Sequence, residues 1–219
     1  MDIEEIKRNF DNVKKYALCA ELALEAVKQS NVCVPIFDKT KEGNVFNICR
    51  ESLYLRCIVE VRRILEPFNR DKRSNLSFLI QSIFNNKEYF IEEHYQSSIQ
   101  EECNGNEEIK SLFYDIAEEE KQNCSNKIDI IQAKWNKIWE MQSEGKSLYF
   151  VREKRDIMVH SIDVTNIYAP PMYKMQKIIS IINWFIKKLE YIINNTATSK
   201  YLLHKQIKDI SKNFWSHMS

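Results

Sequence analysis

Glycine and proline are scarce in this chain. Only three glycines and four prolines occur among its 219 residues, although glycine alone usually makes up about 7% of a protein. Tight turns between strands commonly need glycine, so the shortage argues against a sheet of many strands. It indicates long helices, and we expect an all-α fold.

A strong excess of either charge is also missing. The chain has 32 Lys and Arg against 31 Asp and Glu, so any phosphate binding must come from a local patch rather than from net charge. No apolar run approaches the roughly 20 residues that span a bilayer. The start MDIEEIKRNF is charged from its second residue, unlike a signal peptide. We therefore expect a cytoplasmic protein with no membrane partner.

Metal and cofactor motifs are absent from the sequence. The six cysteines form no CxxC pair, and no glycine-rich phosphate loop, HExxH or GxSxG occurs. His94 has glutamate neighbours but no second histidine at helical spacing, so we predict no metal site and no cofactor. Without an export signal the thiols are expected to be reduced, and Cys49 and Cys57 are interpreted as small core residues on an apolar stripe.

Apolar residues recur every three or four positions along most of the chain, which predicts amphipathic helices. The expected helices cover 2–30, 44–66, a segment that begins near 76, 107–142, 147–160, 171–194 and 199–217. Ser74 or Asn75 can cap the third of these. Segments 31–43, which contains Pro35, and 97–106 are expected to be loops. We predict one antiparallel bundle of six or seven helices over residues 1–219, with 199–217 as an appendage.

Charged and aromatic side chains are unevenly distributed. The net balance is −8 over residues 84–121 and +6 over 172–219, which fits either a binding face or ordinary solvated helix faces. Five aromatic residues could stack nucleic-acid bases: Trp135, Trp139, Tyr149, Phe150 and Trp184. Their helical spacing among isoleucines favours the interpretation that they belong to the core.

The stretch REKRDIMVHS, residues 152–161, combines arginine with one of the four histidines in the chain. His160 can transfer a proton near neutral pH, and Arg155 offers a planar charged group that fits phosphate oxygens. Together they provide what RNA cleavage through the 2′-hydroxyl needs without a metal ion. Arg152 and Lys154 could contact the RNA backbone, or be solvated charges beside Glu153.

The spacing within this motif suggests a second subunit. Residues five positions apart on a helix are rotated by about 140°, so one helix does not easily aim both Arg155 and His160 at the same phosphate. Either the helix ends between them or a two-fold homodimer brings two copies of the segment together.

The arrangement Arg155-Asp156-Ile157-Met158-Val159-His160 resembles the signature of the HEPN superfamily of all-α, usually dimeric proteins. Segments 54–83 and 154–163 are similar to HEPN-like domains of the AbiU type, which are linked to abortive phage infection. This resemblance implies a HEPN-like domain with its motif region at 147–163. It also implies a metal-independent endoribonuclease that acts on cellular RNA as a toxin or phage-defence effector.

The resemblance assigns roles to three residues. Arg155 would bind the scissile phosphate, His160 would act as general acid or base, and Asp156 would orient either of them. An antitoxin or another regulatory partner would be expected. Some members of the superfamily are catalytically silent, so the alternative is a HEPN-like dimer that binds nucleotide, RNA or a protein partner.

Overall fold

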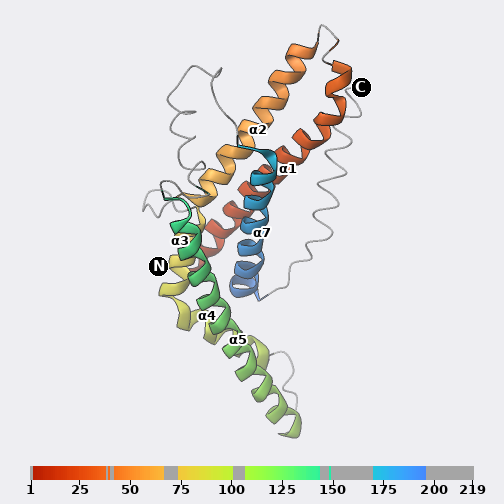
Figure 1. Cartoon of the computed structure of the whole chain (residues 1–219). Coiled ribbons are helices and arrows are strands. Elements are labelled where there is room, and N and C mark those ends of the chain that lie inside the picture. Colours follow the sequence, from red (N-terminus) through yellow and green to blue (C-terminus); the bar gives the residue numbers. More distant parts are fainter. Residues whose placement is uncertain are drawn as a thin grey trace.

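The computed structural model of this chain describes residues 2–37, 39, 42–66, 74–100, 107–143, 148 and 170–195. Within them it contains helices and no strand, which confirms the all-α prediction (Figure 1). The helices are α1 (Ile3–Phe37), α2 (Gly43–Leu65), α3 (Leu76–Asn85), α4 (Lys87–Gln100), α5 (Glu107–Glu140) and α7 (Met172–Asn194). The helix predicted at 199–217 lies outside the described residues, as does the one predicted at 147–160 apart from Leu148.

Helices α1 and α2 pack side by side as a long hairpin (Figure 1). The side-chain carboxylate of Asp2 accepts a hydrogen bond from the Glu4 N–H, which caps the start of α1. The predicted break at residues 31–43 is wrong in its first part, because α1 continues through Pro35 to Phe37. Proline removes one N–H from the helix, and the helix ends two residues later. There the Phe37 ring stacks on Phe46 of α2, with centroids 4.5 Å apart.

The second helix corrects one prediction about the core. Cys57 is buried as expected, but Cys49 is exposed. Near its start α2 is covered by α1, and the core residue there is Phe46. Further along, the buried face of α2 is wider and includes the pair Cys57 and Ile58. Cys49 lies at the margin of the narrow part, so its side chain meets solvent.

Asn75 caps α3, as the sequence predicted for this residue or Ser74. Its side-chain oxygen accepts a hydrogen bond from the Phe78 N–H at 2.8 Å. The helix ends at Asn86, whose side chain donates to the Ser82 carbonyl at 2.7 Å. Helix α4 begins at the next residue and runs to Gln100, so the loop predicted at 97–106 starts later than expected.

The long helices α5 and α7 have the bounds that their periodicity predicted, to within two residues. The inward face of α5 includes Ile128, Ile131, Trp135 and Ile138, whereas Ile116, earlier in the same helix, is 42% exposed. Helix α7 ends at Asn195, the one non-glycine residue with positive φ in the described segments. Asparagine tolerates this left-handed conformation at a helix end. Its side chain also donates to the Ser97 hydroxyl at 2.8 Å, which ties the end of α7 to α4.

A continuous apolar core joins all of these helices. Helix α7 contacts α1, α2, α4 and α5, and its buried side chains are the centre of the core. The largest side chains with less than 2% exposure are Phe10, Phe90, Phe185, Ile6, Ile64, Leu76, Leu79, Met175, Ile178, Ile182, Leu189 and Ile192. This arrangement places one face of α7 against the core and leaves the neighbouring face beside α5.

Candidate functional site

The five residues predicted to act on RNA lie outside the described residues: Arg152, Lys154, Arg155, Asp156 and His160. Their roles and their relation to a second subunit therefore remain predictions. The described chain resumes at Pro170, whose carbonyl accepts a hydrogen bond from the hydroxyl of Tyr54 on α2. Burial raises the pKa of Tyr54 above its usual range, so this hydroxyl stays a donor at neutral pH and holds the start of α7 against α2.

Helix α2 also carries a buried carboxylate. Glu60 is 1% exposed, and one of its oxygens lies 2.5 Å from the guanidinium of Arg56, which is 61% exposed. Arg63 lies over the ring of Tyr16 on α1, 4.2 Å from its centroid. Both arginines contact groups of the bundle itself, and Arg56 is paired with a carboxylate.

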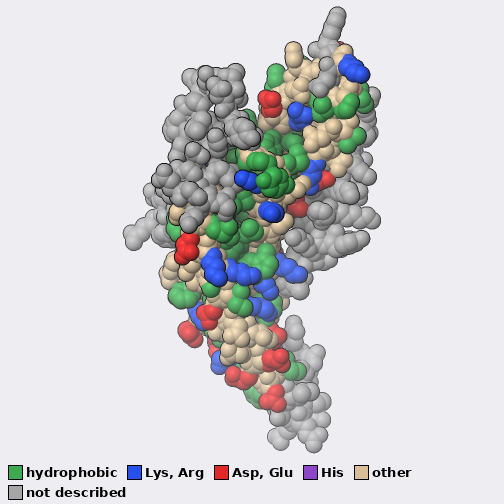
Figure 2. Space-filling model, in the orientation of Figure 1, with side chains coloured by type: hydrophobic (Ala, Val, Ile, Leu, Met, Phe, Trp, Pro, Cys, Tyr) green, Lys and Arg blue, Asp and Glu red, His purple; other side chains and the backbone are tan. Residues whose placement is uncertain are grey.

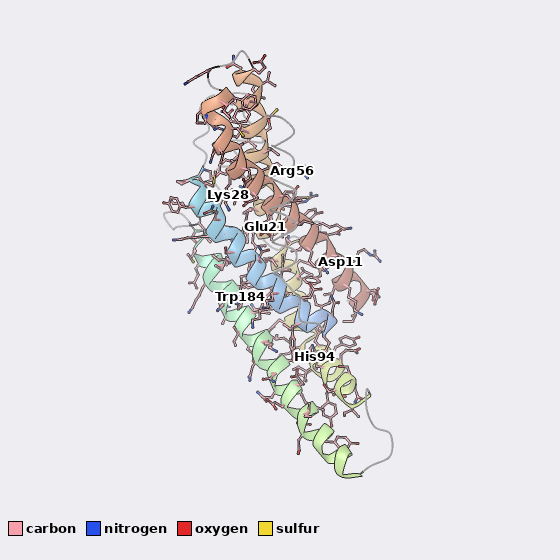
Figure 3. The ribbon with its side chains drawn as sticks, turned by 90° about the vertical axis from the view of Figure 1, so that its right-hand side faces the viewer. Asp11, Glu21, Lys28, Arg56, His94 and Trp184 are labelled. Atoms are coloured by element: carbon pink, nitrogen blue, oxygen red, sulfur yellow. The ribbon has the colours of Figure 1, made fainter. Side chains whose placement is uncertain are left out.

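His94 lies at the other end of α7, between α4, α5 and α7 (Figure 3). It is 1% exposed, and its Nε2 lies 3.2 Å from the carbonyl oxygen of Ile192. Its ring packs against Tyr191, with centroids 4.7 Å apart. The Tyr191 hydroxyl donates to the carboxylate of Glu120, so three helices meet through one polar cluster.

The polar cluster around His94 has a structural role. Burial lowers the pKa of His94 below its ordinary value, so the imidazole is neutral at pH 7 and donates to the Ile192 carbonyl. That carbonyl belongs to the last turn of α7, where no intrahelical N–H is available. Within the described residues no group of three or more His, Cys, Asp or Glu side chains is placed to hold a metal ion.

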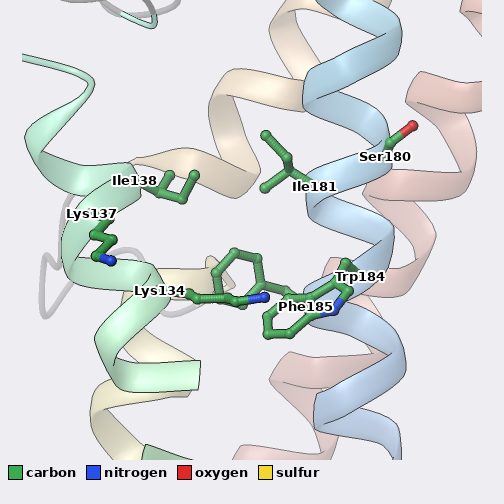
Figure 4. Close-up of a pocket in the computed structure, with 7 residues that line it drawn as sticks. All are labelled: Lys134, Lys137, Ile138, Ser180, Ile181, Trp184 and Phe185. Carbon is green, nitrogen blue, oxygen red and sulfur yellow. The ribbon is translucent and has the colours of Figure 1, made fainter. Parts of the chain in front are cut away.

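A groove of about 400 Å³ lies between α5 and α7 (Figure 4). Its lining residues are Lys134, Lys137, Ile138, Ser180, Ile181, Trp184 and Phe185. Figure 4 shows Lys134 reaching from α5 towards Trp184 and Phe185 on α7. The Lys134 ammonium is 4.1 Å from the centroid of the Trp184 ring. The groove therefore has an apolar floor with a cation held over an aromatic face.

A second lysine–aromatic pair lies seven residues away on each of the two helices. The Lys127 ammonium lies 3.2 Å from the centroid of the Tyr191 ring. Lys127 precedes Lys134 by seven residues on α5, and Tyr191 follows Trp184 by seven on α7. Two lysine–aromatic pairs thus repeat along the α5–α7 seam at a spacing of about 10 Å.

Lysines are the charged residues of the two helix segments that form this groove. Residues 130–139 and 172–189 contain six lysines and no acidic residue: Lys134, Lys137, Lys174, Lys177, Lys187 and Lys188. Lys134 and Lys137 form no ion pair with another residue that the structure describes. Figure 2 shows basic side chains gathered over the middle of the face in view, and acidic ones mainly towards the end where α4 and α5 pack.

The sequence predicts that the tryptophans of α5 and α7 belong to the core. That interpretation is confirmed for Trp135, which is 5% exposed, and wrong for Trp139, which is 39% exposed. Trp184 is partly buried and lines the groove. The seven-residue spacing of Lys127 and Lys134 on α5 is visible in the sequence. That these lysines lie over Tyr191 and Trp184 of α7 follows only from the packing of the two helices.

Among the described helices, none combines the length and the apolar character that crossing a bilayer requires. Comparison with known proteins identified no relative: no family model matches the chain, and no curated protein or solved structure is significantly similar to it.

Proposed function

We propose that this protein is a metal-independent endoribonuclease of HEPN type that acts as a homodimer on cellular RNA. The observation that carries the proposal is the Arg155–His160 motif within a chain whose described part is all-helical. Arg155 stabilises the charge on the five-coordinate phosphate, and His160 transfers the proton at the 2′-hydroxyl or the leaving oxygen. Asp156 orients one of the two side chains.

The biological setting proposed with this activity is a toxin or phage-defence effector. Such an enzyme needs restraint in the growing cell, so an antitoxin or a regulatory partner is part of the proposal. Arg152 and Lys154, next to the motif in the sequence, add contacts to RNA phosphates that weaken with salt.

The test is cleavage of transfer RNA and messenger RNA by the full chain in the presence of EDTA. Activity is expected for the wild type and a loss of at least about 100-fold for Arg155→Ala and for His160→Ala, because a positioned acid or base contributes about that much. Arg8→Ala, an exposed arginine on α1, is the control and is expected to remain active. Cleavage that requires a metal ion, or that both motif variants retain, contradicts the mechanism.

Oligomeric state gives a second, independent measurement. Light scattering at micromolar concentration is expected to show a dimer of the 26.2 kDa chain. Mixing Arg155→Ala with His160→Ala subunits is expected to restore part of the activity if each site uses residues of both subunits. A monomer rules out the shared site. A dimer that binds RNA without cleaving it identifies the catalytically silent alternative.

A further inference from the structure

The α5–α7 groove has features that the proposed catalytic motif does not use. Its floor is formed by Ile138, Ile181 and Phe185, and Trp184 borders it. Among the described lining residues Ser180 is the one with a hydroxyl, which donates to the carbonyl of Gln176 in its own helix. The described side chains of the floor therefore offer apolar contact and no donor or acceptor pattern with which to distinguish one base from another.

The charge at the groove exceeds what a small amphipathic anion requires. One carboxylate or phosphate would be matched by Lys134 and Lys137. By helical spacing, Lys177 lies one turn from Ile181 and Lys188 one turn from Trp184 on the same face of α7. Burial is the main cause that lowers the pKa of Lys127, Glu120 opposes it, and Lys188 is close enough to lower this pKa further. A row of cations along two helices matches a ligand whose negative charges repeat.

We infer that this groove binds single-stranded nucleic acid. Phosphates lie on the lysines of the α5–α7 seam, and a base packs on the apolar floor beside Trp184, displacing the Lys134 ammonium from the ring towards a phosphate. Proteins that bind single strands without sequence preference combine a basic groove with aromatic stacking platforms. The inference takes RNA as its natural ligand from the proposed function, but binding at the groove does not require cleavage.

Two other occupants fit the groove less well. An acyl chain would use the apolar floor but would leave most of the lysines unmatched. A second copy could present its acidic segment 84–121, but a contact between two different surfaces is heterologous and continues into rings or filaments unless it closes. The lysine–aromatic pairs repeated at seven residues favour a polymer with repeating charges and flat groups.

The experiment measures binding separately from cleavage. Fluorescence anisotropy follows a fluorescein-labelled twelve-residue oligothymidylate, which lacks the 2′-hydroxyl and so cannot be cut by the proposed mechanism. Wild-type full-length protein is titrated at several salt concentrations. The groove variant is Lys134→Gln/Lys137→Gln. The matched control is Lys7→Gln/Lys121→Gln, which removes the same charge from two exposed or half-exposed lysines outside the groove lining.

The groove variant is expected to bind at least about 10-fold more weakly, whereas the control changes binding by less than about twofold. The negative slope of log affinity against log salt is expected to become less steep by about 1.4, since each phosphate contact to a single strand contributes about 0.7. Trp184→Ala is expected to weaken binding by about 5- to 150-fold, the loss of one stacked base, and Trp184→Phe by less. Circular dichroism establishes that each variant is folded.

Three outcomes overturn the inference. They are no binding by the wild type, equal losses in the groove and control variants, and salt-sensitive self-association that the groove variant abolishes while oligonucleotide binding persists. The last outcome identifies an interface between copies of the chain. Failure of the proposed function gives a different result. Groove-dependent binding without RNA cleavage supports the groove and contradicts the ribonuclease proposal. RNA cleavage with an unchanged KM in the groove variant supports the ribonuclease and contradicts the groove.

Discussion

The imidazole of His94 on α4 contacts the carbonyl oxygen of Ile192 on α7, with 3.2 Å between Nε2 and the oxygen. The other ring nitrogen, Nδ1, has no hydrogen-bond partner among the described residues. The surrounding groups have opposing effects, because Glu120 favours the charged imidazolium and Lys127 opposes it. Burial is the largest influence and lowers the pKa of His94.

This contact predicts that stability falls in mild acid. The pKa of His94 is lower in the folded than in the unfolded chain, so the unfolded state binds more protons once the pH drops below about 6.5. The stabilising effect of neutral His94 is complete above that pH and decreases as the pH falls towards the folded-state value. Urea unfolding between pH 7.5 and 5 measures it.

His94→Gln is the matched variant, because it keeps an N–H donor for the Ile192 carbonyl and does not titrate. We expect its stability to vary less with pH over the same interval than that of the wild type. Equal pH dependence in the two proteins would show that other groups dominate and would remove His94 from the explanation.

The capping bond of Asn75 predicts a local effect on α3. Asn75→Ala is expected to lower the free energy of unfolding by about 1 kcal/mol, because the buried Phe78 N–H loses its acceptor. Asn75→Asp keeps the acceptor and is expected to cost much less. Asn85→Ala, at the exposed end of the same helix, serves as a control. A loss no greater in Asn75→Ala than in Asn85→Ala contradicts the capping role.

The buried carboxylate of Glu60 predicts that removing Arg56 alone destabilises the protein more than removing both residues. Arg56→Ala leaves that charge without its cation and is expected to cost about 1–2 kcal/mol, less than for a fully buried pair because Arg56 is exposed. Arg56→Ala/Glu60→Leu is expected to recover most of this loss, since the uncompensated charge is gone. Lys121→Ala, which breaks an exposed pair with Glu118, is the control. Equal costs for Arg56→Ala and Lys121→Ala argue against the coupling.

The cysteines are expected to differ in their reaction with iodoacetamide at pH 8. Burial raises the pKa of Cys57 to about 12 and that of Cys124 to about 11, and both side chains are inaccessible. Cys49 is exposed. Peptide mapping by mass spectrometry should therefore find Cys49 alkylated in the native protein, with Cys57 and Cys124 protected until denaturant is added, because the accessible thiolate is the reactive species. Labelling of Cys57 at the rate of Cys49 contradicts this packing.

The helices of this protein follow from local properties of the chain. A spacing of three to four residues between apolar side chains is repeated within each helix, so the bounds of α5 and α7 were predicted closely. Asn75 was predicted as a cap because its acceptor serves an N–H only three residues away. The Arg155–His160 hypothesis also comes from the sequence alone, since both residues lie in one short motif.

Other features depend on which helix covers which face, and only the tertiary structure decided them. Cys49 and Ile116 belong to apolar stripes but are exposed, because no described neighbour covers those positions. His94 is among mostly polar neighbours in the sequence, yet the middle of α5 and the end of α7 meet there and bury it. Lys134 and Trp184 are fifty positions apart, and their pairing exists because α5 and α7 pack side by side. Amphipathic periodicity specifies that a helix buries one face, whereas the partner of that face is set by long-range packing.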